Sequence, residues 1–200
     1  MHKILNNYFY KLGLFFIAIC SMNFTNKMVY CALIFTILTT ILNGIAKCHG
    51  SKKATISILS CTSIALLLLY NKPYFIAGKP INHLIPTSLG AILVASYIGY
   101  KIFLKLETRL GFPLSNCISL FIAALVDHLI MGLFFARLFP MRSVCSMFYK
   151  ETVYTYLFGS LIYLLWLAFL YAKPIYRKLK AYLTLSSSRR LAEPKTPPRL

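Results

Sequence analysis

The chain has 200 residues, of which 58% are hydrophobic and only 13% charged, and its mean hydropathy is +0.69. Such a composition excludes an ordinary soluble domain of this length and indicates a polytopic membrane protein. The 22 Lys and Arg give a net charge of +18, but they gather in short segments between apolar runs, which favours a role in membrane orientation over nucleic-acid binding. We therefore expect the lipid bilayer, and no nucleic acid, as a partner.

Six apolar runs are predicted to be helices that cross the bilayer, since each approaches the roughly 20 residues that a span requires. In chain order they comprise residues 8–24, 28–46, 54–70, 83–106, 113–139 and 152–172. The segments predicted to connect the later runs are 47–53, 71–82, 107–111 and 140–151. The first run follows a basic start without a small-residue cleavage site, so we interpret it as a retained span or signal anchor.

Orientation is predicted from the basic residues. With a cytoplasmic N-terminus, 16 of the 22 Lys and Arg lie in cytoplasmic segments, as the positive-inside rule prefers. An even number of spans then places both termini in the cytoplasm. The predicted fold class is therefore an all-α transmembrane bundle of about six spans, formed by residues 1–172. Residues 173–200 are polar and basic and are expected to be a disordered cytoplasmic tail.

Asp127 is the first candidate functional residue, because it is an acid near the middle of the apolar run 113–139. A carboxylate at bilayer depth costs about 2.5–3.5 kcal/mol, so an intramembrane acid is by default a candidate for a functional site. It continues a stripe of small and polar residues at i, i+4 spacing, which predicts that this helix face looks away from lipid. The stripe consists of Ser115, Ser119, Ala123 and Asp127. A packing role would instead require a partner for the acid, and the candidates are Lys101, His128, Arg137 and Lys150.

Other polar positions each have two interpretations. His128 beside Asp127 suggests a proton relay, but adjacent helical residues point about 100° apart. The face that carries Thr39 and Asn43 could bind a polar ligand, although Thr in membrane helices also bonds its own backbone and joins helices. Tyrosines such as Tyr100 could stack on a flat heterocycle or form an interfacial belt. The stripe Thr87, Ala91, Ala95 and Gly99 favours close helix packing.

The sequence lacks the usual signatures of catalysis. It has no phosphate-binding Gly-rich loop with its Lys, no H-E-x-x-H and no G-x-S-x-G. The remaining acids, Glu107, Glu151 and Glu193, fall at or beyond the ends of apolar runs, so no acid pair for hydrolysis is expected. The six Cys show no C-x-x-C spacing, which predicts neither disulfides nor a zinc site. We expect no enzyme, no cofactor and no metal, and any transport would be facilitated, ion-coupled or powered by a partner.

Three short patterns resemble a known family. Ser119 and Asp127 lie eight residues apart in an apolar helix, and Phe134-Phe135 follows. An apolar run ends in a polar patch at Asn43 before a basic turn, and the Gly99 helix leads into a Lys/Arg-rich turn. In this order the patterns are similar to those of the queuosine precursor transporters, small vitamin-uptake-like membrane proteins of bacteria. The resemblance implies a multi-pass transporter of the bacterial inner membrane that imports queuine or a related 7-deazaguanine.

The resemblance also implies a small-molecule substrate site near the middle of the membrane. Its residues would be Asp127, Ser119, Asn43, Thr39, Tyr100 and His128, with Asp127 accepting hydrogen bonds from the base. Two alternatives stay open. One is a substrate-binding membrane component that depends on a separate ATP-driven partner, and the other is a structural membrane protein in which Asp127 pairs with a basic residue to fix helix docking. A homo-oligomer is compatible with each of them.

Overall fold

The structure is a computed structural model and describes residues 7–25, 27–72, 75–76, 79–81 and 83–192. It divides into two compact units, Met1–Leu161 and Ile162–Leu200. The first unit contains the helix bundle and every residue of the candidate site. The predicted tail falls in the second unit, and its residues 193–200 lie outside the described residues.

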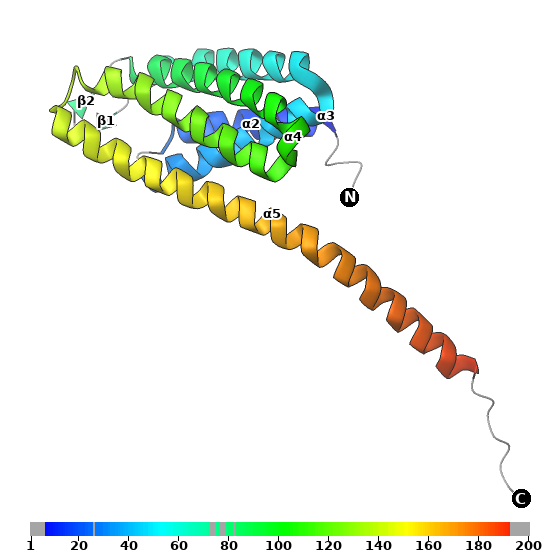
Figure 1. Cartoon of the computed structure of the whole chain (residues 1–200). Helices are drawn as coiled ribbons and strands as arrows, with labels where there is room; N and C mark the ends of the chain where they lie inside the picture. Colours follow the sequence, from blue (N-terminus) through cyan, green and yellow to red (C-terminus); the bar gives the residue numbers. More distant parts are fainter. Residues whose placement is uncertain (1–6, 26, 73–74, 77–78, 82, 193–200) are drawn as a thin grey trace, which may run out of the picture. The chain divides into compact units, whose positions relative to one another are not determined.

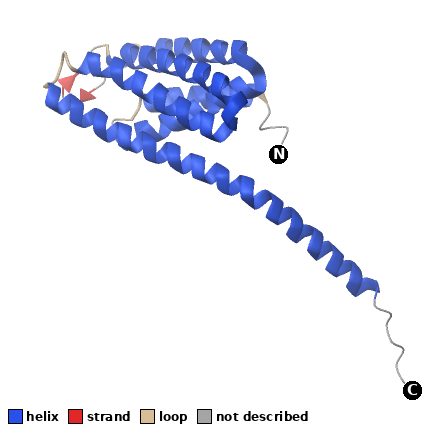
Figure 2. Cartoon of the chain, viewed as in Figure 1, coloured by secondary structure: helices blue, strands red, loops and turns tan. Residues whose placement is uncertain are grey.

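The described residues form four helices and one hairpin of two very short strands, as Figures 1 and 2 show. In chain order these are α2 (Tyr8–Met22), α3 (Met28–Leu69), β1 (Phe75–Ile76), β2 (Lys79–Pro80), α4 (Leu84–Phe135) and α5 (Met141–Ala192). The two strands pair antiparallel. The predicted all-α class is confirmed. Helix α5 continues through Ala192, past residue 173 where a polar tail was expected to begin.

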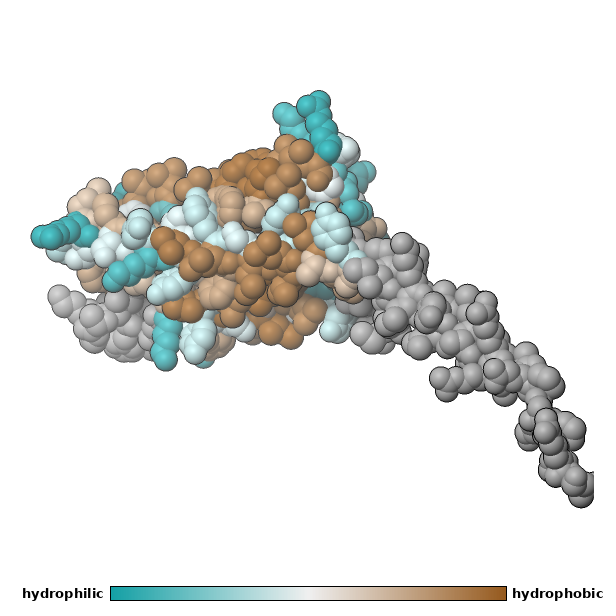
Figure 3. All heavy atoms as spheres, turned by 60° about the horizontal axis from the view of Figure 1, so that its bottom comes forward, coloured by the Kyte–Doolittle hydropathy of each residue, from teal (hydrophilic) through white to brown (hydrophobic). Residues whose placement is uncertain are grey.

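Three of the described helices are long and apolar enough to cross a membrane, namely α3, α4 and the Met141–Phe169 part of α5, whereas α2 has only 15 residues. Large apolar side chains such as Leu67 and Leu133 are well exposed, and Figure 3 shows a broad apolar area on one face. Such a surface suits lipid rather than water. The fold is that of a helical membrane protein, as the composition predicts. The count of six separate spanning helices is not confirmed.

Helices α3 and α4 each change direction at one glycine. Gly50 has φ 86° and ψ 167°, and Gly111 has φ 72° and ψ 171°. This region of backbone space is essentially restricted to glycine. Each glycine falls inside a segment that was predicted to turn, 47–53 or 107–111, and divides its helix into two arms. Pro113 follows the second glycine near the start of a new arm, where a proline is tolerated because its missing N–H is not needed.

The two arms of α4 pack closely against each other. Gly99 and Ala123 are equally far from Gly111 in the sequence, and a Cβ built on Gly99 would lie 2.9 Å from the Ala123 Cβ. Ala95 on the same stripe is completely buried. The prediction that this stripe of small residues serves helix packing is therefore confirmed. The arms form a helical hairpin whose contact depends on the absence of a side chain at position 99.

Two further contacts complete the bundle. Helix α2 buries Phe15 and Ile19 in a core cluster that also contains residues of α3 and α4. Helix α5 approaches α4 at another glycine, because a Cβ built on Gly159 would lie 2.7 Å from Leu120 Cδ2 and 3.3 Å from Phe121 Cε1. Both contacts join helix segments that are distant in the sequence.

Candidate functional site

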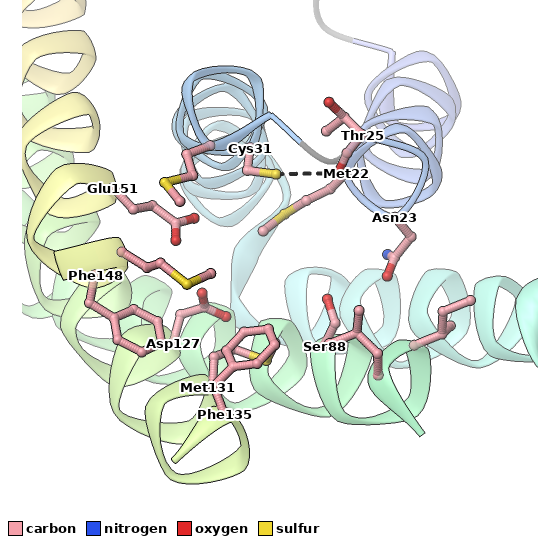
Figure 4. A pocket seen from close by; sticks show the side chains of 14 residues that line it. Met22, Asn23, Thr25, Cys31, Ser88, Asp127, Met131, Phe135, Phe148 and Glu151 are labelled. Atoms are coloured by element: carbon pink, nitrogen blue, oxygen red, sulfur yellow. Dashed lines mark hydrogen bonds between the residues drawn. The ribbon is translucent and has the colours of Figure 1, made fainter. Parts of the chain in front are cut away.

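A cavity of about 130 Å³ lies among all four helices of the first unit. Its lining residues are Met22, Asn23, Thr25, Met28, Cys31, Leu84, Ile85, Ser88, Asp127, Met131, Phe135, Met147, Phe148 and Glu151. Most of these side chains are apolar, and two of them are acids. Figure 4 shows Asp127 from α4 and Glu151 from α5 directed toward the same space.

Asp127 reaches this cavity from the inward face of the second arm of α4. Ser115, Ser119 and Ala123 on the same face are completely buried, and Asp127 is 5% exposed. The predicted orientation of this stripe away from lipid is therefore confirmed. Neighbouring helices cover Ser115, Ser119 and Ala123, and Asp127 is the residue of the stripe that lines the cavity.

Glu151 is the second acid of the cavity, and it was not predicted as a site residue. It was assigned to a connecting segment, 140–151, because the last span was expected to begin at Thr152. Helix α5 in fact begins at Met141, directly after Pro140, so Glu151 lies well inside a helix. The sequence does contain a signal for this, because Val144, Phe148, Glu151, Thr155 and Gly159 follow one helical face. Val144, Thr155 and Gly159 are indeed buried.

The two acids differ in their partners. Glu151 Oε2 lies 3.8 Å from His128 Nε2, and the other ring nitrogen, His128 Nδ1, is hydrogen-bonded to Thr152 Oγ1 at 2.9 Å. In the part of the chain that the structure describes, no ion pair and no hydrogen bond involves the Asp127 side chain. His128 therefore contacts Glu151 rather than Asp127, as expected for residues that are adjacent in a helix.

The predicted cationic partners of Asp127 lie elsewhere. Lys101 Nζ donates a hydrogen bond to Ser51 Oγ at 3.2 Å, near the two glycine turns. Arg137 and Lys150 are exposed. Among the described residues, no fixed ion pair therefore holds Asp127 in place.

Asn43 and Ser119 meet in a separate polar network between α3 and α4. Asn43 Nδ2 donates to Asn116 Oδ1 at 2.8 Å and to Ser119 Oγ at 2.7 Å. Asn116 Nδ2 donates onward to Thr40 Oγ1 at 3.2 Å. The Thr40 hydroxyl donates its hydrogen to the Thr36 carbonyl. It therefore accepts the hydrogen bond from Asn116 Nδ2, and Asn116 Oδ1 accepts the one from Asn43. Among the described residues, the buried Asn43 Oδ1 has no hydrogen-bond partner.

The last two predicted site residues also have partners of their own. Thr39 Oγ1 donates to the Phe35 carbonyl at 2.9 Å, and the Tyr100 hydroxyl is hydrogen-bonded to Thr55 Oγ1 at 2.6 Å. Neither residue lines the cavity. The structure thus brings Asn43 and Ser119 together and places Asp127 in the cavity, but the six predicted site residues do not surround one space.

The cavity offers hydrogen-bond acceptors rather than a metal site. Ionised carboxylates only accept hydrogen bonds, and the nearby Cys31 thiol donates to the Thr25 carbonyl at 3.6 Å, the dashed line in Figure 4. Among the described residues, no three His, Cys, Asp or Glu side chains are grouped so that they could hold a metal ion. The site therefore suits a ligand with N–H donors or a positive charge.

The fold and the apolar surface define a helical membrane protein, and the acids define a polar site inside it. Comparisons with protein-family models, with curated proteins and with solved structures find no match for this chain.

Proposed function

We propose that this chain is a membrane transporter whose substrate binds in the cavity between Asp127 and Glu151. The observation that carries the proposal is a buried carboxylate, Asp127, which has no hydrogen-bond or ion-pair partner among the described residues and is directed into a cavity within an apolar helix bundle. A charge at such a depth costs about 2.5–3.5 kcal/mol. Serine and alanine fill the neighbouring positions of the same stripe, and no ion pair or hydrogen bond among the described residues offsets the cost of the charge at Asp127. A substrate whose N–H groups donate hydrogen bonds to the Asp127 carboxylate would compensate this free-energy cost.

The proposal includes six membrane crossings, with both termini in the cytoplasm of a bacterium and the chain in its inner membrane. The arms of α3 and α4 on either side of Gly50 and Gly111 are each close to or above the roughly 20 residues that a crossing needs. The two turns lie at the same end of the bundle, because Lys47 Nζ contacts Glu107 Oε1 at 2.7 Å. Several Lys and Arg flank these turns, which supports a cytoplasmic position for them.

The proposed substrate is queuine or a related 7-deazaguanine, on the basis of the sequence resemblance. The acceptors of the cavity suit the adjacent N–H donors of a guanine-like base, and Phe135 and Phe148 offer faces on which a flat ring could stack. The cavity of about 130 Å³ must widen to admit such a base, since typical ligand sites have roughly 300–1,000 Å³. Its methionine walls favour this, because Met side chains are flexible and adapt to different contents.

Restoration of queuosine in tRNA tests the proposal. A bacterium without precursor uptake of its own would receive limiting queuine and express the wild-type chain, Asp127→Asn or Glu107→Gln at matched membrane levels. Glu107 is the control acid, because it pairs with Lys47 and does not line the cavity. We expect the wild type and Glu107→Gln to restore queuosine and Asp127→Asn to restore at most a tenth as much.

Two other results would overturn the proposal. If no form restores queuosine although all insert normally, the substrate is wrong. If Asp127→Asn only lowers the amount of folded protein and the remainder transports at the wild-type rate, Asp127 serves helix docking. Dependence of uptake on additional subunits and ATP would identify the chain as the binding component of a partner-powered system.

A further inference from the structure

The cavity combines two acids with walls that contain no basic residue. Its 14 lining residues include neither Lys, Arg nor His. Asp127 is 95% buried, as its 5% exposure shows, and is directed into the cavity without a partner among the described residues (Figure 4). Among the described residues, the one ion-pair contact of Glu151 is with the His128 ring, at 3.8 Å, and that ring is positive only when it is protonated. The cavity therefore has an excess of negative charge whenever its acids are ionised.

The remaining walls are soft and apolar. Four of the six methionines of the chain line this one cavity, together with Phe135 and Phe148. Thioethers adapt to irregular apolar groups, and aromatic faces attract cations. The described residues group no three strong metal ligands, and the space is larger than a bare ion requires. An organic group that joins a positive charge to an apolar or flat body satisfies both the acids and the walls.

We infer that this cavity binds an organic ammonium group, held between the Asp127 and Glu151 carboxylates, with the rest of the ligand against the methionine and phenylalanine walls. The inference rests on the proposed function and specifies the charge of the substrate. Among 7-deazaguanines it selects those with a protonated amine on the side chain over neutral ones. Asp127 and Glu151 each contribute a carboxylate to the recognition of the charged ligand.

Binding to the purified full-length chain in lipid nanodiscs tests this inference with two pairs of probes. The first pair is 7-aminomethyl-7-deazaguanine, which is protonated at neutral pH, and 7-cyano-7-deazaguanine, which is neutral. The second pair is benzylammonium and benzyl alcohol. Each probe is titrated against the wild type, Glu151→Gln, the charge-preserving Glu151→Asp and the control Glu107→Gln. Size-exclusion profiles and melting temperatures establish that each variant is folded.

We expect the wild type and Glu107→Gln to bind the charged member of a pair at least tenfold more tightly than the neutral member. Glu151→Gln should reduce that difference by weakening the charged probe at least tenfold, with the neutral probe changed less than twofold, while Asp127 still supplies one carboxylate. Glu151→Asp should retain a preference for the charged probe. If only the benzyl pair behaves in this way, the ammonium site is supported and the proposed deazaguanine substrate is wrong.

Three results would overturn the inference. The first is that neither amine binds the folded wild type. The second is that charged and neutral probes bind equally well. The third is that Glu151→Gln weakens both members of a pair to the same extent, because the residue would then shape the cavity without recognising charge.

Discussion

Replacement of Gly111 by alanine tests whether the reversal of α4 depends on backbone conformation. Gly111 has φ 72° and ψ 171°, and residues other than glycine adopt this region at a cost of about 1–3 kcal/mol. An added Cβ would meet no atom within 4 Å, so backbone strain accounts for the whole effect. We expect Gly111→Ala to lower the free energy of unfolding by about 1–3 kcal/mol. The arm that carries Asp127 would lose its fixed direction at the same time.

Gly90→Ala is the matched control for this variant. Gly90 lies in the same helix, has helical backbone angles and is also free of atoms within 4 Å of an added Cβ. Alanine is preferred over glycine inside a helix by about 0.5–1 kcal/mol, so Gly90→Ala should be neutral or stabilising. The two variants should therefore differ by about 1–4 kcal/mol. Reversible unfolding in mixed detergent micelles, followed by far-UV circular dichroism, measures both, and equal stability of the two variants would refute the reasoning.

Three further predictions use the same unfolding assay. Gly99→Ala places a Cβ 2.9 Å from the Ala123 Cβ and should destabilise the fold by about 1–3 kcal/mol through overpacking; Ala123→Gly should restore part of this, and simple addition of the two losses would argue against a direct contact. Asn43→Ala removes the donor to the buried Asn116 Oδ1 and should cost about 1–3 kcal/mol, so an unchanged stability would contradict the network. Asp127→Asn should stabilise the ligand-free protein by about 1 kcal/mol or more, because the fold disfavours the ionised acid, which has no partner among the described residues; a loss of stability would favour a docking role for the acid.

The sequence predicted features that depend on one helix at a time. The inward face that ends at Asp127 follows from i, i+4 spacing, and the close contact at Gly99 follows from a stripe of small residues. The turns around Gly50 and Gly111 were placed correctly because glycine and basic residues interrupt the apolar runs. Their positive φ values could not be predicted, since glycine also occurs inside helices of this chain, as at position 90.

The cavity could not be predicted from the sequence because it joins segments that are distant in the chain. Residues such as Met22, Ser88, Asp127 and Glu151 meet only through the packing of four helices. Glu151 was missed because the start of its helix was placed at residue 152, which assigned the acid to a loop. Asn43 was recognised as part of a polar face, but its partner on α4 was not, because side-chain pairing between helices leaves no local pattern.

Gly159 does not line the cavity, but it affects the spacing of the helices that carry the two acids. It lies on the same face of α5 as Glu151, eight residues further along, which corresponds to about 12 Å of helix. Because a helix bends little over such a length, the close approach of α5 to α4 at Gly159 also limits how far apart the two helices lie at Glu151 and Asp127. The absence of a single methyl group at position 159 thus limits the width of the space between the two helices, and with it the size of the group that fits between the two acids.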